Sequence, residues 1–394
     1  MLTTKENASL INLRRDIHRC PELSSHENLT AKRLLEELEQ LNPDGLFDQL
    51  GVTGTGEKST GIAACFGEKK RENKTFSKII LFRCELDALP IEETINLAYK
   101  SIHQGVSHKC GHDGHMAILM AVATYFSKYR PQGFQVICLF QPAEETGYGA
   151  QQVINDPRFS QLNPDMVFSL HNVPGLALGA AFIRTGTLCC ASRGLTISYR
   201  GKSAHAAQPE TGISPVPAIY KTIEVLENIN KYLEVESTLS FATIVGIKLG
   251  DKAFGTAPSH SELYVTLRSD SNGVMDKYIQ FITQEVKQLS EQFGLELELN
   301  FQDVFAATIN TPNAVSLVKA ALIEEPVVEL DTPFRWSEDF GLFTAKYCGA
   351  MFGLGAGLDT PALHDSKYDF PDELIEIGSR YFIKIAKEVM STNS

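Results

Sequence analysis

The sequence predicts an α/β protein in which a second, smaller α+β domain interrupts the first. Three observations support this. Short apolar runs alternate with helical patterns across residues 78–170, segments of alternating polar and apolar residues fill 193–301, and the first character returns after residue 304. Strands that alternate with helices are typical of a mostly parallel sheet with helices on both faces. Polar–apolar alternation is typical of an antiparallel sheet with one wet face.

The first segment contains elements of both kinds. Two helices are expected within residues 10–41, broken at Cys20-Pro21 because proline interrupts a helix. The apolar runs 78–84, 134–140 and 165–170 predict strands buried on both faces. Between the first two runs, residues 115–129 carry apolar side chains at helical spacing and end just before Pro131.

The middle of the chain has a different pattern. Residues 193–200, 261–268 and 295–301 alternate like half-buried strands, and residues 215–232 and 274–293 have helical spacing. We therefore expect an antiparallel sheet with helices in this region.

The α/β character then returns. An apolar strand is expected at 347–354 and an amphipathic helix at 372–390. We therefore predict one discontinuous domain formed by residues 1–186 and 304–394, with residues 187–303 inserted in it.

Charge and composition exclude several classes of protein. The 394 residues include 48 acidic and 36 basic side chains, for a net charge of −12, which argues against a nucleic-acid partner or docking on anionic lipid. We see no apolar run long enough to span a bilayer and no signal-peptide pattern at the N-terminus. A cytoplasmic enzyme without a membrane partner is expected, with most of the eight scattered cysteines as free thiols.

Metal-ligating residue types follow several of the predicted strands. In open parallel sheets, ligands bind beyond the carboxyl ends of the strands. The residues placed there are Cys110, His112, Glu144, Glu145, His171 and His364. Taken singly, each has an ordinary explanation as a buried thiol, a loop histidine or a surface carboxylate. Their common placement at one edge indicates a metal site.

The adjacent acids Glu144 and Glu145 follow a buried strand and Pro142. Side chains of neighbours on an extended segment point to opposite sides, so one carboxylate is expected to face a metal and the other the substrate. One cysteine, three histidines and one of the two glutamates make five ligands. Five exceed what one tetrahedral zinc needs and suit two metals that share a bridging ligand. Thiolate and imidazole favour zinc over magnesium or calcium, with manganese, cobalt and nickel also compatible.

At these residues the sequence resembles metallopeptidase family twenty, specifically its amidohydrolase branch of N-acyl-amino-acid amidohydrolases, hippurate hydrolases and auxin-conjugate hydrolases. The resemblance runs in order along nearly the whole chain. The matching segments are LRRDIHRCPELSSHE at Leu13, RCELDALPIEE at Arg83, GVSHKCGHDGHMA at Gly105, FQPAEETGYGA at Phe140, LHNVPG at Leu170, GKSAHAAQP at Gly201, SEDF at Ser337 and LHDSKYDF at Leu363. The pair CGHDGH and QPAEE is the most specific.

The resemblance implies a two-metal amidohydrolase that splits N-acyl amino acids into a carboxylic acid and an amino acid. It implies that Cys110 bridges the metals, with His112 and His171 on one of them and Glu145 and His364 on the other. It also assigns roles beyond the ligands. Glu144 would be the general base, His205 would come from the inserted domain of a homodimer partner, and Asp87 and Asp113 would be supporting carboxylates.

The chain departs from the family pattern at two positions. The wider clan has a metal-binding histidine where this chain has Glu85, although the amidohydrolase branch lacks that histidine as well. The inserted domain carries Gly255 in place of a family asparagine expected to hold the substrate, which leaves the choice of substrate open. Arg268 is a candidate to bind the substrate carboxylate.

Other functions remain alternatives. Cys110 as the nucleophile of a cysteine hydrolase lacks a recognisable nucleophile signature. The stretches GVTGTG at Gly51 and GLGAG at Gly353 are incomplete dinucleotide-binding motifs. A non-catalytic binding descendant is a further alternative. A dipeptidase or carboxypeptidase of the same family also fits.

Overall fold

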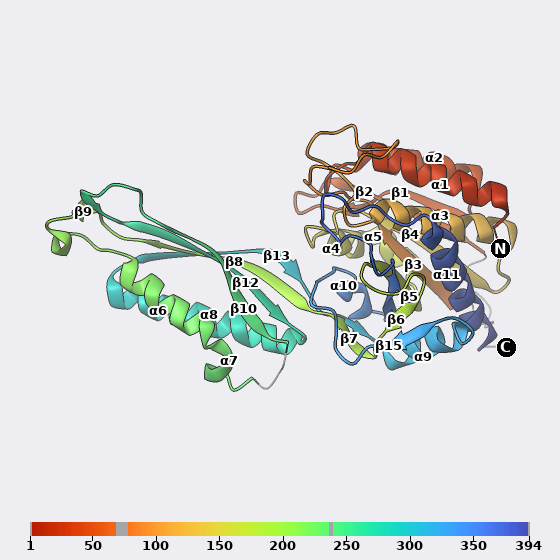
Figure 1. Cartoon of the computed structure of the whole chain (residues 1–394). Helices are drawn as coiled ribbons and strands as arrows, with labels where there is room; N and C mark the ends of the chain where they lie inside the picture. The colour runs from red at the N-terminus through yellow and green to blue at the C-terminus, as the bar shows by residue number, and fades with distance from the viewer. Residues whose placement is uncertain (1, 68–77, 236–238, 393–394) are drawn as a thin grey trace. The chain divides into compact units, whose positions relative to one another are not determined.

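The computed structural model describes residues 2–67, 78–235 and 239–392 (Figure 1). The chain divides into two compact units. The first comprises Met1–Leu188, Thr308–Thr332 and Asp339–Ser394, and the second comprises Cys189–Ala307 and Pro333–Glu338. Among the described residues, we find no helix with the length and apolarity needed to cross a membrane.

The first unit contains a mixed sheet whose centre is parallel. Its strands, in spatial order, are β1 (Gly45–Val52), β2 (Lys58–Phe66), β4 (Phe134–Gln141), β3 (Lys78–Glu85), β5 (Met166–Val173), β16 (Cys348–Gly355), β6 (Ala181–Ile183) and β15 (Val327–Glu329). The contiguous strands β4, β3, β5 and β16 are mutually parallel. These are the four strands predicted in this part of the chain, and their apolar runs are buried as expected.

Register brings the carboxyl ends of these strands together. Glu85 of β3 pairs with Gln141 of β4, and His171 of β5 pairs with Gly353 of β16. The segments that leave the four strands therefore begin at one edge of the sheet, where the candidate ligands are expected.

Helices pack on this sheet. They are α1 (Thr4–Arg19), α2 (Asn28–Gln40), α3 (His112–Lys128), α4 (Gly149–Asn155), α5 (Pro157–Leu162), α9 (Pro312–Ala321), α10 (Gly341–Thr344) and α11 (Glu373–Ser391). Helix α3 packs against both α1 and α11. Gly378 of α11 allows the close packing of α11 on α3, because a Cβ there would lie 2.7 Å from the Ile118 side chain of α3.

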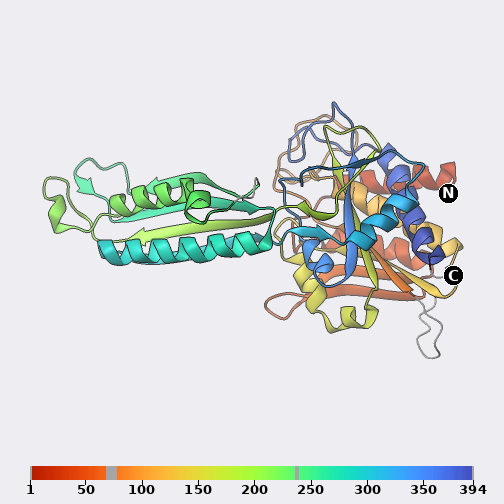
Figure 2. The same ribbon diagram turned by 90° about the horizontal axis from the view of Figure 1, so that it is seen from below.

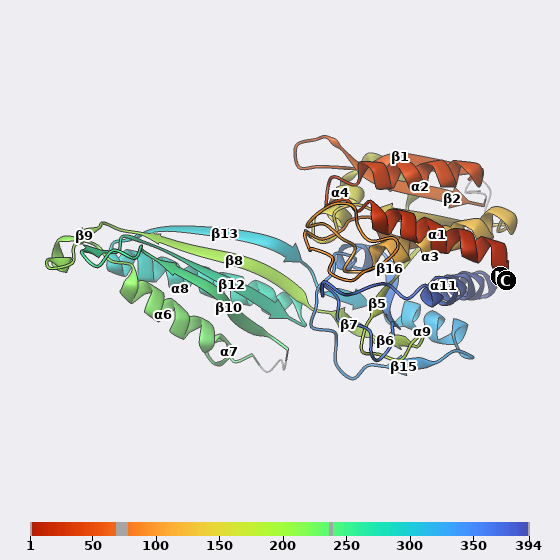
Figure 3. The same cartoon turned by 45° about the horizontal axis from the view of Figure 1, so that its top comes forward.

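The second unit is built on an antiparallel sheet with the order β10-β12-β8-β13 (Figure 3). These strands are β10 (Phe241–Leu249), β12 (His260–Ser269), β8 (Ala191–Arg200) and β13 (Glu296–Phe305). Helices α6 (Val216–Glu227) and α8 (Asn272–Phe293) cover one face, and α8 runs along the sheet (Figure 2). The predicted helix 215–232 is divided at Asn228, after which the short α7 (Ile229–Tyr232) follows. A small ribbon pairs β9 (Ala204–His205) with β11 (Thr256–Ala257).

The boundary of the second unit differs from the sequence-based expectation. The segment Pro333–Glu338 groups with the second unit, whereas the prediction assigned it to the first. Contacts within that unit explain this, since the Cys190 N–H donates to the carbonyls of Phe334 and Trp336 at 3.2 and 3.1 Å. The GVTGTG stretch forms the hairpin turn between antiparallel β1 and β2 and does not open a helix, which removes the context a dinucleotide-binding motif requires.

Candidate metal centre

Several elements of the first unit supply the candidate ligands. Cys110 precedes α3, and His112 is the first residue of that helix. The helix starts earlier than predicted because Gly111 caps it with a φ of 94°, a left-handed conformation that glycine adopts without strain. His171 lies within β5, near its end. Glu144 and Glu145 follow β4, and His364 lies in the loop after β16.

The five ligand candidates form two clusters that share Cys110. In the first, Cys110, His112 and His171 offer ligand atoms within 4.8 Å of one another. In the second, Cys110, Glu145 and His364 do the same. Individual distances are 3.4 Å from Cys110 Sγ to His171 Nε2 and 3.8 Å from His364 Nε2 to Glu145 Oε1. The backbone of His364 has a φ of 67°, an uncommon conformation for a residue other than glycine.

The expectation that Glu144 and Glu145 point to opposite sides of an extended segment is wrong. The strand ends at Gln141, and both acids lie in a turn in which the Gly147 N–H donates to the Glu144 carbonyl at 2.7 Å. Each carboxylate has an oxygen 3.9 Å from His112 Nε2. Ala143 causes the change of direction, because its φ of 49° takes the chain out of the extended conformation.

Two buried atoms of the site are available to bind a metal. His112 Nε2 and Glu145 Oε1 lie 3.9 Å apart, and neither has a hydrogen-bond partner among the described residues. Buried polar atoms are rarely left without a partner, and binding of an ion is one accepted reason for such atoms. A divalent cation between an imidazole nitrogen and a carboxylate oxygen would satisfy both. The residues present therefore fit a metal.

Backbone carbonyls orient two of the imidazoles. His112 Nδ1 lies 2.8 Å from the Asp87 carbonyl oxygen, and His171 Nδ1 lies 2.9 Å from that of Asn172. A carbonyl only accepts hydrogen bonds, so each Nδ1 carries a proton. In the neutral ring, each Nε2 then has the lone pair that faces the cluster. This is the tautomer that a metal ligand needs.

The local charges also favour a cation. Burial, together with the charges of the Asp87 and Glu85 carboxylates, raises the pKa of Glu145 to about 7 against the opposing effect of His112. Burial by itself lowers the pKa of His112, yet its hydrogen bond to Asp87 and the surrounding carboxylates raise it to about 10. Burial and the nearby Glu145 raise the pKa of the Cys110 thiol. A bound metal would relieve this crowding of anionic groups and favour the thiolate.

The two supporting carboxylates have different surroundings. Asp87 accepts hydrogen bonds from the Glu145 N–H at 2.9 Å and the Ser24 hydroxyl at 2.6 Å, and its Oδ1 lies 3.4 Å from His112 Nδ1. Asp113 instead contacts Arg14 at 3.3 Å and His18 at 2.8 Å. Asp113 therefore joins α3 to α1. Neither of these two contacts is with an imidazole of the candidate ligands.

Sequence reasoning missed a buried chain behind the ligands. Arg83 pairs with Glu85, and Glu85 accepts a hydrogen bond from His115 Nδ1 at 2.6 Å. The His115 ring in turn packs edge-on against His171, with 4.8 Å between ring centroids. His112 and His115 are three positions apart and so share a helix face, which is the sequence signal that could have revealed this chain.

The remaining predicted site residues, His205 and Arg268, belong to the second unit. His205 is exposed, and its Nδ1 accepts the Ala207 N–H at 3.1 Å, which leaves the ring proton on Nε2. Arg268 Nη1 donates to the Arg335 carbonyl at 2.8 Å and to the Ser337 hydroxyl at 3.1 Å. At Gly255 a Cβ would meet nothing within 4 Å, so space does not explain the glycine.

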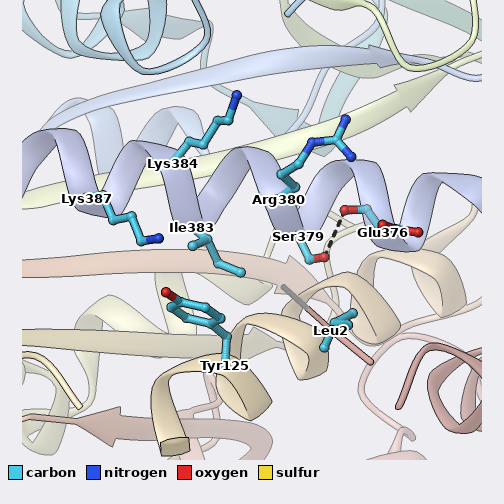
Figure 4. Close-up of a pocket in the computed structure, with 8 residues that line it drawn as sticks. All are labelled: Leu2, Tyr125, Glu376, Ser379, Arg380, Ile383, Lys384 and Lys387. Carbon is cyan, nitrogen blue, oxygen red and sulfur yellow. Dashed lines mark hydrogen bonds between the residues drawn. The ribbon is translucent and has the colours of Figure 1, made fainter. Parts of the chain in front are cut away.

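A surface cavity of about 180 Å³ in the first unit lies apart from the candidate ligands (Figure 4). It is lined by Leu2, Tyr125, Glu376, Ser379, Arg380, Ile383, Lys384 and Lys387. Its cations have partners, since Arg380 and Lys384 pair with Glu325 and Lys387 lies over the Tyr125 ring. We assign the cavity no part in the chemistry.

The fold and the paired clusters define a class of enzyme, the metal-dependent hydrolases of linear amide bonds. Comparison with known proteins agrees. Residues 81–388 match the model of peptidase family M20/M25/M40, and the chain belongs to this family.

Individual relatives are similar over almost their full length. The chain is 31% identical to an N-acetyldiaminopimelate deacetylase of Limosilactobacillus reuteri, with 96% of each chain covered. It is 30% identical to a hippurate hydrolase of Campylobacter jejuni, covering 95% of this chain and 94% of that protein. Among solved structures, a dinuclear metal-binding M20 peptidase from Bacillus subtilis superimposes with a TM-score of 0.79 at 25% identity, covering 99% and 100%. An aminohydrolase from methicillin-resistant Staphylococcus aureus superimposes with a TM-score of 0.84 at 24% identity, covering 97% of each chain.

Proposed function

We propose that this enzyme hydrolyses the amide bond of N-acyl amino acids, releasing a carboxylic acid and an amino acid. The observation that carries the proposal is the pair of ligand clusters sharing Cys110, with the Glu144 carboxylate 3.9 Å from one of the ligands, His112. Relatives named for N-acetyldiaminopimelate and hippurate, which are both N-acyl amino acids, support the substrate class.

The ligand set suits two divalent cations. Cys110 would bridge them, with His112 and His171 on one side and Glu145 and His364 on the other. Thiolate and imidazole favour zinc, and manganese, cobalt or nickel would fit the same ligands. When bound, such ions lower the pKa of water towards 7 and polarise a carbonyl.

The chain's own residues then carry the protons. Glu144 accepts a proton from the attacking water and passes it to the nitrogen of the leaving amine, acting as base and then as acid. His205, with its proton on Nε2, donates to the carbonyl oxygen as negative charge develops there. Asp87 and Asp113 hold the surrounding elements in place, and Arg268 is proposed to bind the substrate carboxylate.

We also propose that the second unit, corresponding to the inserted domain, serves as a lid and dimerisation domain, with His205 acting on the substrate of the other subunit. Exposed apolar side chains on β10 support this, because β10 is an edge strand and Val245 and Ile247 are 63% and 47% exposed. A cytoplasmic location fits the free thiols of Cys20, Cys84, Cys110, Cys138 and Cys348.

A substrate panel tests the proposed function. Purified protein is loaded with zinc, manganese, cobalt or nickel and assayed on N-acetyl, N-benzoyl and indole-acyl amino acids and on dipeptides. We expect hydrolysis of acyl amino acids that stops on chelation and returns with metal. Cleavage of dipeptides alone would favour a dipeptidase, and turnover that survives complete chelation would contradict metal dependence.

A further inference from the structure

Glu27 is a buried carboxylate that the proposed chemistry does not use. It immediately precedes α2 and has no exposed surface. Buried carboxylates are uncommon unless their oxygens are well satisfied. The oxygens of Glu27 accept three hydrogen bonds of 2.8 Å, from the Ser25 N–H, the Ala143 N–H and the Thr60 hydroxyl.

One of these bonds reaches the turn that contains Glu144. Ala143 is 116 positions away in sequence and immediately precedes Glu144. Its φ of 49° is unfavourable for an alanine, and such a conformation persists only where the surrounding structure enforces it. The N–H of Ala143 is held by Glu27, and its carbonyl accepts the Gly149 N–H at 3.0 Å. Both sides of the strained residue are therefore fixed.

A second buried carboxylate holds the other side of Glu144. The Glu145 N–H donates to Asp87 at 2.9 Å. The N–H groups of the two residues that flank Glu144 therefore each donate to a carboxylate, that of Ala143 to Glu27 and that of Glu145 to Asp87. A general base must lie within hydrogen-bond reach of the proton that it accepts, and a small displacement of the base slows the reaction.

We propose that Glu27 is a positioning residue of the reaction, which holds the turn at Ala143 and thereby aims the Glu144 carboxylate. This rests on the proposed role of Glu144 as general base. Glu27 acts through geometry and not through its charge, because its three partners are neutral hydrogen-bond donors.

The geometry predicts which substitutions of Glu27 keep the turn at Ala143 in place. In Glu27→Gln, the amide oxygen still accepts the two backbone N–H groups, and the amide nitrogen donates to Thr60, whose hydroxyl can also accept. Glu27→Asp keeps the charge but is one methylene shorter and no longer reaches Ala143. Glu27→Ala leaves both buried N–H groups without a partner.

Glu22 offers a matched control. Its carboxylate lies in the same loop and accepts the Thr30 N–H at 2.8 Å and the Thr30 hydroxyl at 3.0 Å, both at the start of α2. Glu22→Ala therefore removes similar bonds from the same helix without touching the turn at Ala143. A purely structural role of Glu27 would make the two alanine variants alike.

The test measures kcat, KM and metal content of the metal-loaded variants, together with hydrogen exchange of residues 142–149. We expect Glu27→Ala and Glu27→Asp to lose about 10- to 100-fold in kcat with metal content and KM close to wild type. Glu27→Gln should stay within about fivefold of wild type. Exchange in the turn should speed up in the Ala and Asp variants and not in Glu22→Ala.

Several results would overturn the proposal. One is faster hydrogen exchange of the turn in Glu22→Ala as well. Another is exchange of the turn in Glu27→Asp that stays as slow as in wild type. A third is a kcat of Glu27→Gln as low as that of Glu27→Asp. If Glu27→Ala does not fold, the comparison of Gln with Asp decides. Exchange reports on the turn even if wild-type enzyme hydrolyses no acyl amino acid, so failure of the proposed function is distinguishable from failure of this inference.

Discussion

At the scale of single residues, the two adjacent glutamates Glu144 and Glu145 differ in their surroundings. Glu145 has an oxygen without a hydrogen-bond partner among the described residues and lies in a cluster with Cys110 and His364. Glu144 lies beside His112 but outside both clusters that share Cys110. Glu144 also offers an oxygen to a group with His112 and Glu145. We propose that Glu145 is the ligand of the clusters that share Cys110 and that Glu144 transfers the proton.

Substituting each glutamate should separate the two tasks. Glu144→Gln should keep the fold and the metals and lose about 10²- to 10⁴-fold in turnover, because the amide cannot accept the water's proton. Glu145→Gln, the matched variant, should lose both turnover and bound metal. Steady-state kinetics with elemental analysis checks both. A fully active Glu144→Gln enzyme would remove the base assignment.

At the scale of elements, a buried ionic cluster joins α1 to α3. His18 of α1 lies 2.8 Å from Asp113 of α3 and 3.0 Å from Glu93, and all three are buried. Burial by itself lowers the pKa of His18, but the charge of Asp113 and the hydrogen bonds that the ring donates to Asp113 and Glu93 raise it to about 9. A charged His18 therefore stabilises the attachment of α1.

This cluster predicts a pH dependence of stability. Because the folded pKa of His18, about 9, exceeds its unfolded value of about 6.5, the stabilisation is complete below about pH 6.5 and is lost as the pH rises through about 9. The free energy of unfolding should fall by up to about 1.4 kcal/mol per pH unit in that window. His18→Gln should lack this slope. Unfolding curves at several pH values measure it, and equal slopes would contradict the assignment.

At the scale of the whole molecule, the two edges of the second unit's sheet differ. The edge strand β10 exposes Val245 and Ile247, whereas the opposite edge strand β13 exposes polar residues such as Glu296 and Glu298. An exposed apolar edge strand pairs readily with another chain. We therefore expect dimerisation through β10 and not through β13.

A lysine on each edge tests this expectation. Ile247→Lys should convert the dimer into monomers and lower turnover, since His205 would no longer reach the other subunit, while metal content stays unchanged. Glu298→Lys, on the other edge strand, should remain dimeric and active. Light scattering coupled to size-exclusion chromatography measures the mass. A dimeric, fully active Ile247→Lys enzyme would refute the proposed interface.

Much of the first unit could be predicted because the signals are local. The apolar runs that became β3, β4, β5 and β16 are long, buried on both faces and bounded by polar residues, so their pattern indicates strands without reference to anything distant. The hairpin of β1 and β2 was not predicted. Strand β1 has neither an apolar run nor strict alternation, and the apolar run of β2 at 62–66 includes two alanines, which are depleted in strands. The attachment of Pro333–Glu338 to the second unit depends on contacts with Cys190, more than a hundred residues away.

The sequence by itself determined the kinds of chemistry present, since the identity and order of the thiol, imidazole and carboxylate side chains are local and point to a two-metal amide hydrolase. Only the tertiary structure decided how the two adjacent glutamates lie, which nitrogens of His112 and His171 face the clusters, and which distant groups hold them there. The reason is physical. Side-chain direction after a strand depends on one backbone dihedral at Ala143, and that dihedral is held by Glu27, a partner far away in the chain.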